Sequence, residues 1–135
     1  MIDSNAVIDY LSGQIPENGM SFMNSIINDT PIISIMTQIE VLGFNNPTEV
    51  EVFLNEFIDA SLVIPLNDDI VKATIEIRKK NKIKTPDAII AATAIVLDYP
   101  LITRNISDFK KLDGLRIIDP RADALESEKN RWFYT

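Results

Sequence analysis

The chain has 135 residues, of which 46% are hydrophobic and 24% charged, and this is the size and balance of one compact domain. No apolar run reaches the roughly 20 residues that a membrane helix needs, and no basic stretch precedes an apolar one at the N-terminus, so we expect neither a membrane span nor a signal peptide. The formal net charge of −7 argues against a protein that binds nucleic acid through a basic surface alone.

Histidine and cysteine are both missing from the sequence. This excludes disulfides, cysteine zinc sites, thiol nucleophiles, Ser-His-Asp triads and histidine-based ribonuclease mechanisms. It also fits a protein of the reducing cytoplasm. Any acid–base chemistry near neutral pH must therefore come from carboxylates or lysines with shifted pKa values, or from metal-bound water.

Short β-branched runs alternate with longer amphipathic runs along the chain, which is typical of βαβ units around a parallel sheet. In chain order we predict a strand over 1–3, helices over 5–12 and 19–28, a strand over 31–35, a helix over 37–42, a helix that starts at 46–48, and a strand over 60–66. Helices over 68–80 and 85–97, a strand over 100–103, a helix over 106–111 and a strand over 115–118 follow. Residues 1–120 are expected to form the domain and residues 121–135 a C-terminal extension.

Apolar residues spaced by three and four predict which helix faces are buried. The expected inward sets are Val50, Phe53, Leu54 and Phe57 in one helix, and Ile70, Val71, Thr74 and Ile77 in the next. Thr85 is predicted to be the N-cap of the following helix, with Pro86 at its first position. The apolar run over 88–97 predicts that this helix is buried on most of its circumference.

Four carboxylates fall near the carboxyl ends of the predicted strands or in the helix starts beyond them. They are Asp3, Glu40, Asp87 and Asp108, and we call them the acidic cluster. In an open parallel α/β sheet these positions share one edge. Carboxylates that close raise one another's pKa values, and a divalent cation relieves the conflict. Oxygen-only ligands suit Mg²⁺ or Mn²⁺ better than zinc or copper, and a metal-bound water can attack a phosphodiester.

Structural roles compete with this interpretation for most of the acidic cluster. Thr37 stands three residues before Glu40, which is a capping-box spacing. Asp87 and Asp108 suit the first turn of a helix, where the dipole favours a negative charge. Asp3 has no evident capping role, because it is a charged residue at the start of an apolar segment of a strand expected to be central in the sheet. The functional interpretation therefore rests on the shared location of the four acids.

Several polar residues lie beside these positions. Ser4 and Asn5 are candidates for binding a metal through water or for orienting Asp3, although a capping role is slightly favoured for them. Thr103, at the end of its strand, is a candidate for contacting substrate or a metal-bound water, or is simply a β-former. Asn105 is a candidate N-cap of the helix over 106–111.

Basic residues near two of the acids are candidates for binding phosphate groups. Arg104, Lys84 and Lys82 are the predicted ligands, and Arg104 ranks first because it lies in the same segment as Asp108. The lysines belong to a basic run that begins at Arg78. For that run, a favourable interaction of cations with a helix C-terminus is the alternative explanation.

Four segments, taken in this order, resemble those of the PIN-domain nucleases, and within them the VapC-like toxins of type II toxin–antitoxin systems. The segments are Ile2-Asp3-Ser4-Asn5 with Ile8; Ile33-Ser34-Ile35 through Thr37 to Glu40; Thr85-Pro86-Asp87-Ala88; and Thr103-Arg104-Asn105 with Asp108-Phe109. No single segment is specific, so the order and the spacings of all four carry the resemblance.

The resemblance implies a three-layer α/β/α sandwich with a central, mostly parallel sheet, usually in a homodimer. It implies a cytoplasmic hydrolase, a Mg²⁺- or Mn²⁺-dependent endoribonuclease, which a cognate antitoxin inhibits by inserting a segment near the acidic pocket. By carry-over, the metal ligands and catalytic residues are Asp3, Glu40, Asp87 and Asp108, and Asn105 is an accessory polar residue. Two features depart from the family: the first strand is short, and the chain after Pro120 is long.

Other classes of protein share parts of this pattern. A non-catalytic PIN-like binding or scaffold module would have the same fold, but degenerate copies tend to lose some of the acids that this chain keeps. A phospho-acceptor receiver domain needs paired acids at the first strand and a lysine after the last, whereas Asp3 stands alone and no lysine closely follows the strand over 115–118. The sequence contains no Gly-x-x-x-x-Gly-Lys segment, which excludes a P-loop protein.

Overall fold

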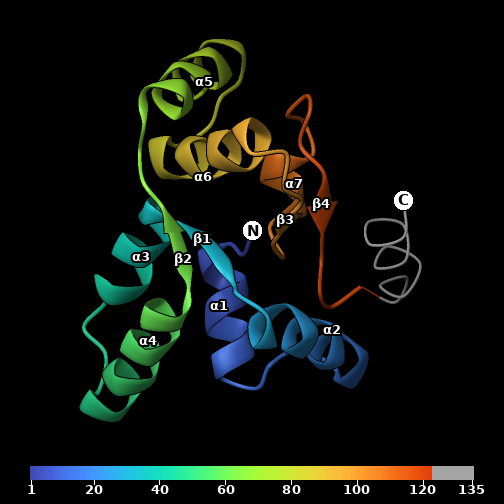
Figure 1. The fold of residues 1–135 in the computed structure, drawn as a ribbon. Coiled ribbons are helices and arrows are strands. Elements are labelled where there is room, and N and C mark those ends of the chain that lie inside the picture. Colours follow the sequence, from blue (N-terminus) through green and yellow to red (C-terminus); the bar gives the residue numbers. More distant parts are fainter. Residues whose placement is uncertain (123–135) are drawn as a thin grey trace.

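Helices and short strands alternate along the computed structural model, which describes residues 1–122 (Figure 1). The helices are α1 (Ser4–Leu11), α2 (Glu17–Asn28), α3 (Ile35–Leu42), α4 (Thr48–Ala60), α5 (Asp68–Lys80), α6 (Thr85–Val96) and α7 (Ile106–Phe109). The strands are β1 (Ile32–Ser34), β2 (Leu62–Ile64), β3 (Leu101–Ile102) and β4 (Ile117–Ile118). Within residues 1–122, no helix is long and apolar enough to cross a membrane. The predicted C-terminal extension lies outside the described residues from residue 123 onward.

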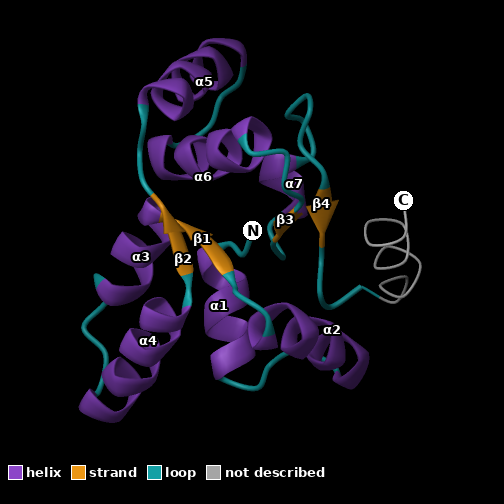
Figure 2. Ribbon diagram, in the orientation of Figure 1, coloured by secondary structure: helices purple, strands orange, loops and turns teal. Residues whose placement is uncertain are grey.

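Two pairs of parallel strands form the sheet, and the first residues of the chain lie between them (Figure 2). The backbone N–H of Ile2 donates to the Ile32 carbonyl oxygen at 2.9 Å, and Ile2 forms a parallel bridge with Ile102. The spatial order is therefore β2, β1, residues 1–3, β3 and β4. Every observed pairing is parallel, which confirms the predicted α/β fold with a parallel sheet.

Successive residues of each strand face opposite layers of helices, because side chains alternate along a strand. One core, with side chains from α1 to α4, contains the strand residues Ile2, Ile33, Ile102 and Ile118. A second core, with side chains from α5 to α7, contains the strand residues Met1, Ile32, Leu101 and Ile117. In Figure 1, α5 and α6 lie on one side of the strands, and α1, α2 and α4 lie on the other. This arrangement is the predicted three-layer sandwich.

Four helix starts differ from their predicted positions. Helix α2 begins at Glu17, two residues before the predicted start. Ser34 is the N-cap of α3, and its Oγ accepts the Met36 N–H at 3.0 Å, so the helix begins before Thr37. Lys84 occupies the N-cap position of α6, which makes Thr85 the first helical residue, and the prediction of Thr85 as the cap was wrong. Asp3 is the N-cap of α1. In each case the strand or loop ends earlier than the sequence pattern indicated.

The buried faces of α4 and α5 are narrower than predicted. Leu54 and Phe57 are buried as expected, but Phe53 is 62% exposed and Val50 41% exposed. In α5, Val71 is 38% exposed, although Ile70 and Thr74 are buried. Consecutive residues of a helix point about 100° apart, so residues next in sequence to those that face the core point sideways, toward solvent. The predictions that Val50, Phe53 and Val71 point inward were wrong.

Thr37 has the one buried side-chain nitrogen or oxygen atom within residues 1–122 that lacks a hydrogen-bond partner. A buried hydroxyl without a partner costs roughly 1–3 kcal/mol. We therefore expect Thr37→Val, which keeps the shape and removes the hydroxyl, to raise the free energy of unfolding by about 1 kcal/mol in urea denaturation. Thr37→Ser, which keeps the hydroxyl and removes a methyl group, is the control and should lower it. Destabilisation by Thr37→Val would show that the hydroxyl is hydrogen-bonded in solution.

Candidate active site

Asp3 lies at the carboxyl end of the short first strand and is only 4% exposed. Its Oδ1 accepts the backbone N–H of Ser4 at 2.8 Å. Its Oδ2 accepts the Thr103 hydroxyl at 2.8 Å and the Asn5 side-chain amide at 3.1 Å. The capping role that the sequence suggested for Ser4 or Asn5 therefore belongs to Asp3 itself. That interpretation was wrong because the helix begins directly after the strand.

Ser4 and Asn5 connect Asp3 to the neighbouring segments. The Ser4 hydroxyl donates to Glu40 Oε1 at 2.6 Å, so that α1 and α3 are joined next to Asp3. The Asn5 amide nitrogen donates to the Thr103 hydroxyl at 3.2 Å, and its oxygen accepts the Arg104 N–H at 3.1 Å. Both side chains thus hold together the elements that carry the acidic cluster.

Glu40 lies well inside α3, half-buried, with Ser4 as its hydrogen-bond donor. Because Ser34 caps this helix, Thr37 lies in its first turn and does not form the capping box that its spacing to Glu40 suggested. The structural alternative for Glu40 is therefore wrong. Its side chain faces α1 at the same edge of the sheet as Asp3.

Asp108 lies in the first turn of α7, a short helix that follows β3. Asn105 occupies the N-cap position as predicted, but its side chain makes no capping hydrogen bond. Instead its amide nitrogen donates to Asp108 Oδ2 at 3.0 Å, and its backbone N–H donates to the Thr103 hydroxyl at 3.0 Å. The residues from Thr103 to Asn105 thereby contact two of the four acids.

Asp3 and Asp87 both have raised pKa values. Burial raises the pKa of Asp3 from 3.8 to about 6, against the hydrogen bonds from Thr103 and Ser4, and the charges of Asp87 and Glu40 raise it further. Burial also raises the pKa of Asp87, and the charges of Glu40 and Asp108 add to the effect, whereas Lys84 opposes it. Asp87 is therefore close enough to each of the other three carboxylates for their charges to repel.

A hydrated divalent cation fits this set of donors. Within residues 1–122 no three acidic side chains converge tightly enough to enclose a metal by themselves. Mg²⁺ characteristically keeps several waters and takes only one or two protein carboxylates directly. Oxygen donors alone suit Mg²⁺ or Mn²⁺. Burial, together with the repulsion between carboxylates, raises the pKa values of Asp3 and Asp87, and a cation would stabilise the ionised forms that both effects disfavour.

A hollow of about 450 Å³ joins two of the acids to the basic residues between α5 and α6. Its lining residues are Arg78, Lys82, Ile83, Lys84, Asp87, Asp108 and Lys111. Lys82 and Lys84 were predicted to bind phosphate groups, and both lie here. Lys111 was missed; it lies in the turn just after α7, three residues beyond Asp108. Its ammonium group donates to the Lys82 carbonyl oxygen at 2.6 Å.

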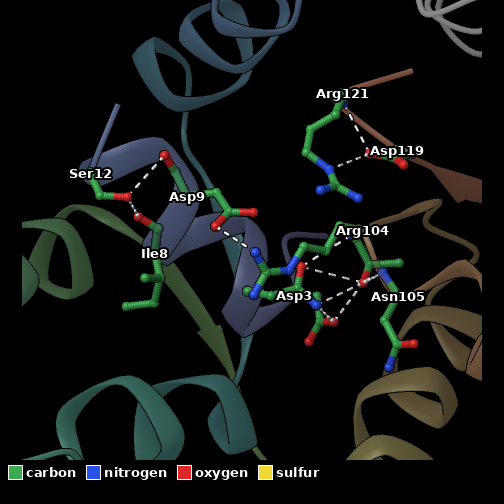
Figure 3. Close-up of polar contacts among 10 residues, drawn as sticks. Asp3, Ile8, Asp9, Ser12, Arg104, Asn105, Asp119 and Arg121 are labelled. Carbon is green, nitrogen blue, oxygen red and sulfur yellow. Dashed lines mark hydrogen bonds and ion pairs between the residues drawn. The ribbon is translucent and has the colours of Figure 1, made fainter. Parts of the chain in front are cut away.

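Arg104 points along α1 (Figure 3). Its Nη1 lies 3.0 Å from Asp9 Oδ1, and the Asp9 side chain is only 8% exposed. The predicted phosphate ligand is thus already paired with a carboxylate. Sequence reasoning missed Asp9, although one signal was available. Asp9 is the one charged residue of α1, and it lies four positions after Asn5, on the same helix face.

Comparisons with known proteins agree with the architecture. Ribonuclease VapC1 of Rickettsia felis is 44% identical over 41 residues, which are 30% of this chain and 31% of that protein, so the chain matches under a third of this relative's length. A toxin–antitoxin complex from Klebsiella pneumoniae has a chain that is 28% identical with a TM-score of 0.72, and the match covers 88% of this chain and 95% of that one. DNA-bound VapBC from Salmonella typhimurium, at 23% identity, matches the fold with a TM-score of 0.75, over 89% of this chain and 96% of that one.

The family model of the PIN domain matches residues 1–115, which include all four members of the acidic cluster and the whole described sheet apart from β4. The strand order, the three layers and the similarity to chains of the toxin–antitoxin and VapBC structures agree with this match. The chain therefore belongs to the PIN domain family.

Proposed function

We propose that this chain is a metal-dependent endoribonuclease. The observation that carries the proposal is the gathering of four carboxylates at one sheet edge, with raised pKa values at Asp3 and Asp87, in a chain that has no histidine or cysteine. The residues that would hold Mg²⁺ or Mn²⁺ are Asp3, Glu40, Asp87 and Asp108. When bound, the cation supplies an acidified water and stabilises the leaving oxygen of the phosphodiester.

The surrounding polar residues orient the acids in this proposal. Thr103 and Asn5 fix Asp3, because both donate to its Oδ2. Ser4 fixes Glu40, and Asn105 fixes Asp108. Partners of this kind hold metal ligands in one orientation and raise the affinity of the site. We assign Ser4, Asn5, Thr103 and Asn105 this accessory role.

The direct test is cleavage of total RNA by the purified chain with Mn²⁺ or Mg²⁺ and with EDTA. We expect cleavage with either metal and none with EDTA. The competing function is a non-catalytic PIN-like scaffold, which would leave RNA intact under both conditions. A Mn²⁺ titration that does not change the melting temperature would favour the scaffold, because a ligand that binds only the folded state must stabilise it.

Lys82 and Lys84 are the proposed phosphate ligands, and the hollow that they share with Asp87 and Asp108 supports this role. In the inactive Asp87→Asn background, Lys82→Ala or Lys84→Ala should weaken the binding of a labelled single-stranded RNA. The slope of log affinity against log salt concentration should fall by about 1 for each lysine removed. The measurement is fluorescence anisotropy at several salt concentrations.

Lys72→Ala is the matched control for these lysine variants, because Lys72 is an exposed residue of α5 outside the hollow. It should change neither the affinity nor the slope. Equal effects of Lys72→Ala and Lys84→Ala would contradict a phosphate site in the hollow and indicate a nonspecific charge effect. Arg104 remains a candidate phosphate ligand. If it binds phosphate, an Arg104 variant should weaken RNA binding, whereas an Asp9 variant, which removes only the partner of Arg104, should not.

We further propose a cognate antitoxin as a protein partner and a homodimer as the assembly. The similar structure from Klebsiella pneumoniae is that of a toxin–antitoxin complex. Exposed apolar side chains lie near Glu40: Ile39 and Phe44 are 56% and 66% exposed and line a small hollow together with it. An apolar antitoxin segment would cover them. Light scattering after size exclusion measures the assembly, and a strictly monomeric chain would contradict the dimer.

A further inference from the structure

The turn between β3 and α7, residues 103–105, holds two members of the acidic cluster. Thr103 donates its hydroxyl to Asp3 Oδ2 at 2.8 Å, and Asn105 donates its amide to Asp108 Oδ2 at 3.0 Å. Asn105 also closes the turn, because its N–H donates to the Thr103 hydroxyl at 3.0 Å. The orientation of Asp3 and Asp108 therefore depends on where this turn lies.

Helix α1 holds the central residue of the turn, Arg104, at two points (Figure 3). The Asn5 side-chain oxygen accepts the backbone N–H of Arg104 at 3.1 Å, and Asp9 Oδ1 accepts its guanidinium Nη1 at 3.0 Å. Asn5 and Asp9 are four residues apart, so both project from one face of the helix. The backbone and the side chain of Arg104 are thus fixed against the same face.

The Asp9 carboxylate is buried and therefore depends on its contact with Arg104. The Asp9 side chain is 8% exposed, whereas that of Arg104 is 47% exposed. A buried ionised carboxylate requires a charged or hydrogen-bonding partner, and within residues 1–122 the ion pair of Asp9 is the one with Arg104. A charge-assisted hydrogen bond from a guanidinium group is short and geometrically demanding. Moving the turn would break it, so the pair resists displacement of the turn.

We propose that Asp9 is a positioning residue for the acidic site, acting through Arg104 on the turn over 103–105. The inference rests on the proposed function, because it concerns the metal that Asp3 and Asp108 would hold. Asp9 does not belong to the acidic cluster, and its part is to keep Thr103 and Asn105 in contact with the carboxylates that they orient. Loss of such outer partners typically lowers metal affinity or activity about 10- to 100-fold.

The test measures Mn²⁺ affinity by calorimetry, and kcat and KM with RNA, for Asp9→Asn, Arg104→Gln and the double variant. Each single variant should bind Mn²⁺ about 10-fold more weakly and have a correspondingly lower kcat, with little change in KM. The double variant should be no weaker than either single variant, because both changes break one interaction. Asp98→Asn is the matched control: Asp98 pairs with Arg116 at the same 3.0 Å, but its side chain is 93% exposed.

Three results would overturn the proposal. If Arg104 binds RNA phosphate directly, Arg104→Gln raises KM and reduces the salt dependence by about one phosphate contact, whereas Asp9→Asn does neither. If the pair only stabilises the fold, both variants melt at lower temperature but bind Mn²⁺ as wild type does. Additive losses in the double variant would show that the two residues act separately.

Asp9→Glu decides the question if the other variants fail to fold. It keeps the charge and an ion pair but moves the carboxylate by one methylene group. A positioning role requires weaker Mn²⁺ binding in this folded variant, and wild-type affinity would overturn it. A wild-type chain that binds Mn²⁺ without cutting RNA contradicts the proposed function alone, since the positioning role is measured from metal affinity. A wild-type chain that does not bind Mn²⁺ overturns both.

Discussion

Asp87→Asn is expected to abolish metal-dependent RNA cleavage, with kcat lower by about 10²-fold or more. The amide has the shape of the carboxylate but lacks its charge, so the site loses a metal ligand and one of the negative charges that attract the cation. Asp87 shares its hollow with Asp108 and the basic residues, so the loss would occur where substrate and metal are proposed to meet. Gel analysis of RNA with Mg²⁺ measures the effect.

The same substitution should not destabilise the metal-free fold. Burial and the charges of Glu40 and Asp108 raise the pKa of Asp87, so its ionised form is less favourable in the metal-free fold than in the unfolded chain. Against this, Asp87 lies in the first turn of α6, where a negative charge contributes roughly 0.3–1 kcal/mol through the helix dipole. We expect a melting temperature in EDTA that is equal to or higher than that of wild type.

Asp69→Asn provides the matched control for Asp87→Asn. Asp69 is also an acidic residue in the first turn of a helix, α5, but it is exposed and lies outside the acidic cluster. Its substitution should reproduce the small loss of dipole stabilisation and leave cleavage unchanged. An Asp87→Asn protein that cuts RNA as fast as wild type would contradict the nuclease proposal and favour the scaffold.

The location of the acidic cluster could be predicted from the sequence because it follows from topology. β-Branched runs separated by amphipathic helices predict parallel strands, and parallel strands present their carboxyl ends at one edge. Asp3 follows the first such run directly, and Asp108 lies in the short helix that begins after β3. This inference does not depend on the exact residue at which a helix begins. The errors at the starts of α3 and α6 therefore do not affect it.

The contacts inside the site could not be predicted, because they depend on those boundaries. A shift of one residue in the start of α1 determines whether Asp3 or Ser4 is its N-cap. Because Asp3 is the N-cap, the Ser4 hydroxyl is free to donate to Glu40. The pairing of Asp9 with Arg104 joins residues 95 positions apart in the chain. No local pattern encodes a pair at that separation, which depends on where β3 lies beside the first strand.

Metal-free wild-type protein is expected to lose stability as the pH rises from about 4 to about 7. Asp3 has an ordinary pKa of 3.8 when exposed and a pKa of about 6 in the fold. Because the folded state binds this proton more tightly, its contribution is complete below pH 3.8 and is lost as the pH rises through about 6. For this buried group, the difference between the two values corresponds to about 3 kcal/mol of unfolding free energy. Urea denaturation in EDTA at several pH values measures it.

Asp3→Asn isolates the contribution of this one carboxyl group. Asparagine caps helices about as well as aspartate, so the amide keeps the α1 cap while removing the charge. In EDTA at pH 8 the variant should be more stable than wild type, and its melting temperature should be higher by roughly 5–10 °C. The difference between the two proteins should shrink toward pH 4, since wild-type Asp3 is then protonated.

Asp3→Ala separates the charge from the cap, because it removes both and should lose about 1 kcal/mol relative to Asp3→Asn at every pH. A cation that binds the folded state should make wild type more stable than Asp3→Asn at neutral pH. Mn²⁺ at 100 times its dissociation constant stabilises wild type by about 2.7 kcal/mol, whereas Asp3→Asn is expected to bind it weakly. If Asp3→Asn is instead less stable than wild type in EDTA at pH 8, then the Asp3 carboxylate is stabilised by its three donors more than it is penalised by burial. The acidic cluster would then not need a cation to be tolerated in the fold.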